Sequence, residues 1–151
     1  MAKYRSSGSQ TLTSSIHTAL VIGSNATTVQ RNWIHEYIIA NVGTPADLVT
    51  LHTVQRTTAI GVQIAVVPTV NDFADRAAQA DVGEDSDPTG PTYTSAEEID
   101  EIPLNNRALY RWVAAPGWEI VCPATAGDGV GWGATHASAT TDWRIQLKHS
   151  E

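Results

Sequence analysis

Cysteine, basic residues and long apolar runs are all scarce in this chain of 151 residues. The single cysteine, Cys122, excludes a disulfide framework within the chain. Nine Lys and Arg residues stand against 16 Asp and Glu, whereas proteins that coat DNA or RNA need clustered basic residues. No apolar run approaches the roughly 18 residues of a membrane-spanning helix. We therefore expect neither nucleic acid nor a membrane as a partner.

The charge is distributed unevenly along the sequence. Between Asp72 and Glu101 there are ten acidic residues and a single base, Arg76. Residues 1–10, by contrast, carry basic residues among serines, which is typical of a flexible N-terminal arm. Such an arm is either a solvated tail or a segment that docks on an acidic neighbouring surface. The residues that would make this contact are Lys3, Tyr4 and Arg5.

Short runs of alternating apolar and polar residues predict β-strands in most of the chain. The predicted strands cover residues 11–22, 31–40, 47–55, 58–67, 107–114, 119–123 and 142–150, and part of the glycine-rich stretch 124–141 is read as an irregular strand. Residues 31–40 are apolar at both parities, which predicts a central strand or one covered on both faces. In 58–67 the side chains of Ile60, Val62, Ile64 and Val66 are expected to face the core.

An acidic insertion at 68–104 separates these strands. Residues 71–80 are predicted to form a helix, capped by Asn71 or Asp72. A second short helical turn is expected at 95–102, where Ser95 and Glu98 have capping-box spacing.

About eight strands without a βα rhythm favour an all-β fold. We expect a single antiparallel β-sandwich domain over residues 11–151, of jelly-roll type, with one insertion that carries short helices.

No arrangement of residues indicates catalysis or a resident cofactor, so none is expected. The five histidines are scattered singly, and Cys122 lies in an apolar run, where burial suppresses thiolate formation. The acidic insertion is the one weak candidate for a metal site, because hard oxygen ligands in a loop suit calcium. Its candidate ligands are Asp81, Glu84, Asp85 and Asp87; the alternative is an acidic solvated loop.

Aromatic residues near predicted turns are candidates for contact with a partner or a sugar. Trp118 follows a Pro-Gly turn, and Trp132 is expected at the tip of a glycine-rich loop. Together with Tyr93 they form the proposed contact set, with packing in the core as the alternative for both tryptophans, whereas Trp112 and Trp143 are expected to face the core.

The chain is rich in Thr, Ala and Val and contains the closing segments LYRWVAAPGWEIVCPATAGDGVGWGATH and DWRIQLKH. In this style it resembles capsid decoration (cement) proteins and head or tail accessory modules of tailed bacteriophages. The resemblance implies a homo-oligomeric β-sandwich, commonly a trimer, on the exterior of the virion capsid. Its partners would be the major capsid protein and copies of itself, and no catalytic residues are implied.

Two functions therefore remain open, and a third, a small hydrolase, would need a carboxylate pair or a His–Asp pair that only the fold could assemble. The first is a structural virion protein that binds and stabilises the capsid shell, with no enzymatic activity. The second is a carbohydrate- or receptor-binding module of a phage fibre or tail.

Overall fold

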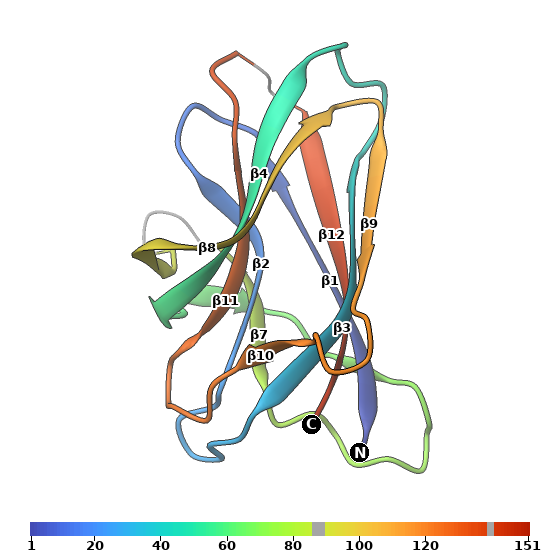
Figure 1. The fold of residues 1–151 in the computed structure, drawn as a ribbon, viewed down its shortest axis with the longest axis vertical. Helices are drawn as coiled ribbons and strands as arrows, with labels where there is room; N and C mark the ends of the chain where they lie inside the picture. The colour runs from blue at the N-terminus through green and yellow to red at the C-terminus, as the bar shows by residue number, and fades with distance from the viewer. Residues whose placement is uncertain (86–89, 139–140) are drawn as a thin grey trace.

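The computed structural model of the protein describes residues 1–85, 90–138 and 141–151. In this part of the chain two antiparallel six-stranded sheets pack as a sandwich, which confirms the predicted architecture, but they contain twelve strands rather than about eight (Figure 1). The described residues contain no helix, and thus none long and apolar enough to cross a membrane.

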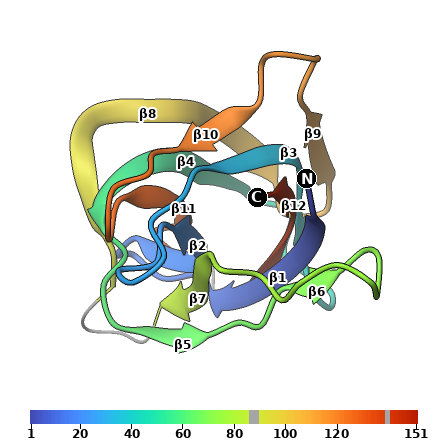
Figure 2. The same ribbon diagram turned by 90° about the horizontal axis from the view of Figure 1, so that it is seen from below.

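The two sheets divide the strands as follows. Sheet A has the order β10 (Ile120–Cys122), β3 (Asn32–Asn41), β12 (Asp142–Ser150), β1 (Lys3–Thr11) and β6 (Thr69–Val70), and β9 (Leu109–Val113) also pairs with β3. Sheet B has the order β5 (Gln63–Ala65), β7 (Asp81–Asp85), β2 (His17–Gly23), β11 (Gly129–Thr135), β4 (Val49–Ala59) and β8 (Thr92–Asn105). Viewed from one end, the strands surround the core that lies between the sheets (Figure 2).

Large aromatic side chains fill the middle of this core. Tyr37, Trp132 and Trp143 are fully buried, which confirms the prediction for Trp143. The ring of Tyr37 stacks on Trp112 at a centroid distance of 5.1 Å and meets Trp132 edge-on at 5.8 Å. Trp112 is partly buried against the core, so it also faces inward as expected.

The predicted flexible arm at residues 1–10 is wrong, because these residues form most of β1. This strand pairs with β12 along its whole length and with β6 on its other side. Its inward residues include Ser6 and Gly8, which carry little apolar surface. The sequence of this segment therefore does not alternate between apolar and polar residues, although its burial does. Gly8 is also required sterically, since a Cβ built there would lie 1.9 Å from the carbonyl oxygen of Ala19 on sheet B.

The predicted helical turn at 95–102 is wrong as well, because these residues belong to β8. Pairing with β4 outweighs the local capping-box pattern. The register of this pair shifts repeatedly between Val54 and Ala59, so β8 bulges outward. Within the bulge Ala96 has φ of 60°, the left-handed conformation that an α-helix does not contain.

Residues 71–80, predicted to be helical, form turns and irregular structure. The expected capping contact does occur, since the Ala74 amide donates to Asp72 Oδ1 at 2.9 Å. Further along, the amides of Gln79 and Ala80 donate to the buried Glu151 carboxylate at 2.9–3.0 Å. These amides therefore donate to a distant side chain and not to backbone carbonyls within a helix.

Of the strand predicted at 58–67, residues 58–59 form the end of β4, and only the three residues of β5 form a separate strand. Val62 and Ile64, expected in the core, are 64% and 59% exposed. Only Val66 of the predicted inward set packs against the core.

Trp132, expected at the tip of a loop, is fully buried in β11, a central strand of sheet B. The glycines on either side of it point outward. A Cβ at Gly131 would lie 2.8 Å from the Tyr93 hydroxyl, so the glycines leave room for the Tyr93 side chain to lie over the strand.

Candidate interaction surface

The outer face of sheet A is an ordered grid of exposed and half-buried side chains. Antiparallel pairing places outward residues of β1, β12, β3 and β9 side by side in three rows. The rows are Ser9, Arg144, Ala40 and Leu109; Ser7, Gln146, Ile38 and Arg111; and Arg5, Lys148, Glu36 and Val113. We call these twelve residues the sheet A face.

The sheet A face carries a net positive charge. Its one acid, Glu36, accepts a hydrogen bond from Arg111 Nε at 2.9 Å and another from Lys148 Nζ at 2.7 Å. These bonds, that of Arg111 foremost, hold the pKa of Glu36 below its ordinary value. Arg5 and Arg144 have no carboxylate within 4.0 Å among the described residues. Their charges therefore remain available to an acidic partner.

An apolar strip runs beside these cations. Leu109 and Val113 of β9 are 64% and 54% exposed. On β3 Leu109 pairs with Ala40 and Val113 pairs with Glu36, and Ile38 lies between these two partners, opposite Arg111. This outward apolar surface accounts for the apolar residues at both parities of 31–40. Apolar centres with charged borders are typical of protein–protein contacts.

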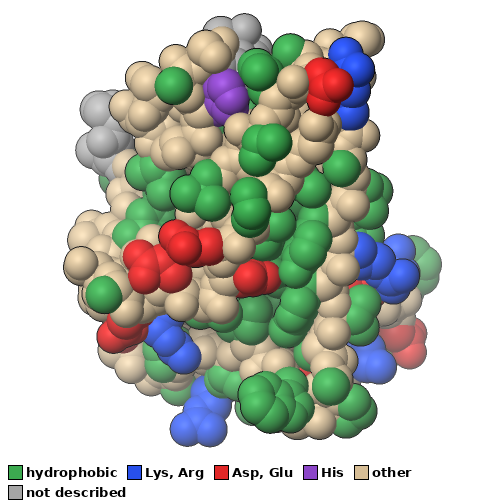
Figure 3. Space-filling view, turned by 45° about the horizontal axis from the view of Figure 1, so that its top comes forward, with side chains coloured by type: hydrophobic (Ala, Val, Ile, Leu, Met, Phe, Trp, Pro, Cys, Tyr) green, Lys and Arg blue, Asp and Glu red, His purple; other side chains and the backbone are tan. Residues whose placement is uncertain are grey.

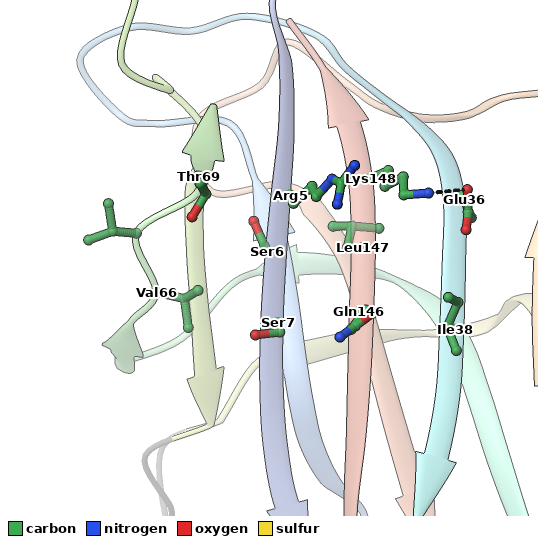
Figure 4. A pocket seen from close by; sticks show the side chains of 11 residues that line it. Arg5, Ser6, Ser7, Glu36, Ile38, Val66, Thr69, Gln146, Leu147 and Lys148 are labelled. Atoms are coloured by element: carbon green, nitrogen blue, oxygen red, sulfur yellow. Dashed lines mark hydrogen bonds and ion pairs between the residues drawn. The ribbon is translucent and has the colours of Figure 1, made fainter. Parts of the chain in front are cut away.

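A shallow pocket of about 320 Å³ opens at one end of the sheet A face (Figure 4). Arg5, Lys148 and Glu36 lie along one row of its floor, with Ser7, Gln146 and Ile38 in the row below. The side opposite β3 is formed by residues 66–69. Its cations and methyl groups suit an acidic, partly apolar protein segment.

A second surface lies on the outer face of sheet B, where β4 pairs with β8. Thr53 lies opposite Glu101, Leu51 opposite Pro103, and Val49 opposite Asn105. Val49 and Leu51 are 59% and 42% exposed, and Glu98 adds a further exposed carboxylate. We call Val49, Leu51, Glu98, Glu101 and Pro103 the β8 patch. Figure 3 shows acidic side chains gathered beside a band of hydrophobic ones on this side of the molecule.

The residues singled out from the sequence do not converge on one site. Lys3, Tyr4 and Arg5 lie in β1: Lys3 and Arg5 point outward, whereas Tyr4 is buried and stacks on His149. Arg5 is the member that belongs to the sheet A face.

The three expected aromatic contacts are separated as well. Trp118 is 80% exposed in the loop between β9 and β10, two strands that both pair with β3. Trp132 is buried, so its expected exposure is wrong. Tyr93 is half-buried, and its hydroxyl lies 2.6 Å from Thr18 Oγ1.

The calcium candidates are placed only in part. Asp81 accepts a hydrogen bond from Asn25, and Glu84 accepts one from the Ser9 amide. Asp87 and the side chain of Asp85 lie outside the described residues. Within the described part of the chain, no three His, Cys, Asp or Glu residues form a group suited to a metal ion.

One cluster that the sequence did not indicate joins the two sheets at their β8–β9 side. The hydroxyls of Tyr37 and Tyr110 both donate to Asp100 Oδ2, at 2.8 and 3.2 Å. Burial, followed by the bond to Asp100, raises the pKa of Tyr37, so both hydroxyls remain protonated donors. Asp100 thereby fixes the edge strand β8 over the core.

Cys122 is fully buried, and its burial raises the pKa of the thiol to about 12. The prediction of a small buried residue rather than a reactive thiolate agrees with this environment.

No protein-family model, curated protein or solved structure matches this chain.

Proposed function

We propose that this protein is a structural subunit that binds other protein subunits through its sheet A face. The observation that carries the proposal is a face on which the exposed Leu109 and Val113 of β9 share their rows with the cations Arg144 and Arg5, respectively. Burial of such side chains against a partner is favourable by about 25 cal/mol per Å² of apolar area. The charged border then selects the orientation and identity of the partner.

The edge strands of the two sheets are poorly suited to pairing with a strand of a partner, which favours binding through a sheet face. The edge strands β5, β6 and β10 have only two or three residues, and the edge strand β9 has five. The long edge strand β8 carries a bulge, Pro103 and exposed carboxylates. Each of these features discourages pairing with a further strand.

The setting that we propose is the exterior of a tailed-bacteriophage capsid, where the protein would act as a decoration subunit without enzymatic activity. A jelly-roll connectivity is part of this proposal. It is supported by the grouping β1–β12–β3–β9 in one sheet and β2–β11–β4–β8 in the other. Jelly rolls with this split of eight strands are frequent in viral capsid domains and also in lectins.

Co-sedimentation of the purified protein with expanded tailed-phage capsids tests the proposal. We expect saturable binding that Leu109→Asp weakens at least tenfold, because the substitution places a charge in the apolar strip. The matched control is Val62→Asp, at an equally exposed valine away from the sheet A face. Absence of binding, or equal loss in both variants, would contradict the proposal.

Trp118 favours a second candidate, the binding of a carbohydrate, because its ring is 80% exposed and free to stack on a sugar. A glycan array probed with the wild-type protein and with Trp118→Ala tests this candidate. Binding that disappears in the variant supports it, and an array without signal rejects it.

A further inference from the structure

The two patches on opposite sheets have opposite charge. The sheet A face presents Arg5 and Arg144 without a neutralising carboxylate within 4.0 Å in the described structure. The β8 patch presents the exposed carboxylates of Glu98 and Glu101. Glu98 receives a hydrogen bond from the neutral side chain of Gln55 at 3.2 Å, which leaves its charge in place.

Each patch also has an exposed apolar part. On the sheet A face Leu109 and Val113 lie on either side of Arg111, and on the β8 patch Val49 and Leu51 precede Thr53, which pairs with Glu101. Both patches are built on paired strands, so their backbones are already ordered and only the side chains lose freedom on binding. An interface between them would place apolar groups together and charges of opposite sign around them.

We propose that the sheet A face of one molecule docks on the β8 patch of a second copy. The contact is head-to-tail, because it joins two different surfaces. A head-to-tail contact closes into a ring or extends into an open chain, depending on the rotation between neighbours. This inference rests on the proposed function, since it names an occupant of the face proposed there.

Charge reversal provides the test, with weight-average mass measured by analytical ultracentrifugation. The wild-type protein is expected to form multiples of 16.2 kDa that dissociate as salt is raised. Arg144→Glu alone and Glu101→Arg alone should each weaken association at least tenfold. Arg31→Glu, an exposed position outside both patches, is the control of equal charge change and should associate as the wild type does.

Mixing the two reversed variants gives the decisive result. The reversed face of Arg144→Glu then meets the reversed patch of Glu101→Arg, and the two unmodified surfaces also meet. We expect the mixture, and the double variant by itself, to regain assembly. Leu109→Ser and Leu51→Ser probe the apolar parts independently and should weaken association without charge reversal. Circular dichroism of each variant checks that the sheets are intact.

A wild-type protein that stays at 16.2 kDa at every concentration would overturn the inference. So would assembly that neither single reversal weakens, or that mixing does not restore. Binding to capsids by a strictly monomeric protein would leave the proposed function standing and remove this contact. Self-association without capsid binding would support this contact and contradict the proposed function.

Discussion

Two buried histidines make the stability of this protein sensitive to acid. His52 and His149 are each 1% exposed, and neither ring nitrogen of either residue has a hydrogen-bond partner among the described residues. The ring of His52 meets Trp143 edge-on at 4.9 Å, and that of His149 stacks on Tyr4 at 5.3 Å. Burial lowers the pKa of each imidazole to about 4, although the charge of Glu151 partly opposes the shift at His149.

These pKa values determine the sign and the size of the change in folding stability with pH. Between pH 6.5 and 4 the unfolded chain binds protons at both histidines while the folded chain does not, so stability falls as the pH is lowered. With pKa values of about 4 folded and about 6.5 unfolded, each histidine costs roughly 1 kcal/mol of stability between pH 7.5 and 5.5. The two together cost roughly 2–3 kcal/mol, a substantial part of a typical 5–15 kcal/mol stability.

Urea unfolding followed by tryptophan fluorescence at several pH values measures this loss. His52→Leu and His149→Leu should each remove about half of the decline between pH 7.5 and 5.5, and the double variant should remove most of it. His17→Gln, at a half-exposed histidine, is the matched control and should keep the wild-type slope. The same slope in wild type and double variant, or greater stability at pH 5.5 than at pH 7.5, would refute the reasoning.

Four further substitutions, measured by urea unfolding, and one thiol-labelling experiment test other parts of the fold. Ala96→Gly should stabilise the protein by about 1 kcal/mol, because glycine adopts the positive φ of this bulge without strain; no gain would contradict a strained bulge. Tyr37→Phe should cost about 1–1.5 kcal/mol through the lost bond to Asp100, and a neutral result would show that this bond contributes nothing. Gly8→Ala should destabilise the protein by about 1–3 kcal/mol or more, since the new Cβ meets backbone atoms. In the control Gly43→Ala the new Cβ meets no atom within 4 Å, so the only cost is the strain of a positive φ. Cys122 should react with a thiol reagent only as fast as the protein unfolds, and rapid labelling would contradict its burial.

The sequence predicted the fold more completely than it predicted the sheet A face. The apolar residues at both parities of 31–40 did predict a central strand, and β3 is paired along both of its edges. They did not indicate which strands would lie beside it, and the sheet A face exists only because β1, β12 and β9 pair with and around β3 in one register. Those partners are far apart in the sequence, so the rows of charges they form leave no local pattern.

The sequence by itself determined the all-β class, the central strands and the burial of Trp143 and Cys122, because alternation with period two records which side of a strand is apolar. Tertiary structure decided the rest. Most of residues 1–10 form a strand of sheet A, with small residues facing inward. Residues 95–102 belong to an edge strand, although their sequence has the pattern of a helix cap. In both segments, hydrogen bonds and packing with distant strands outweighed local preference, since β-pairing energy comes from partners that the neighbouring sequence does not contain.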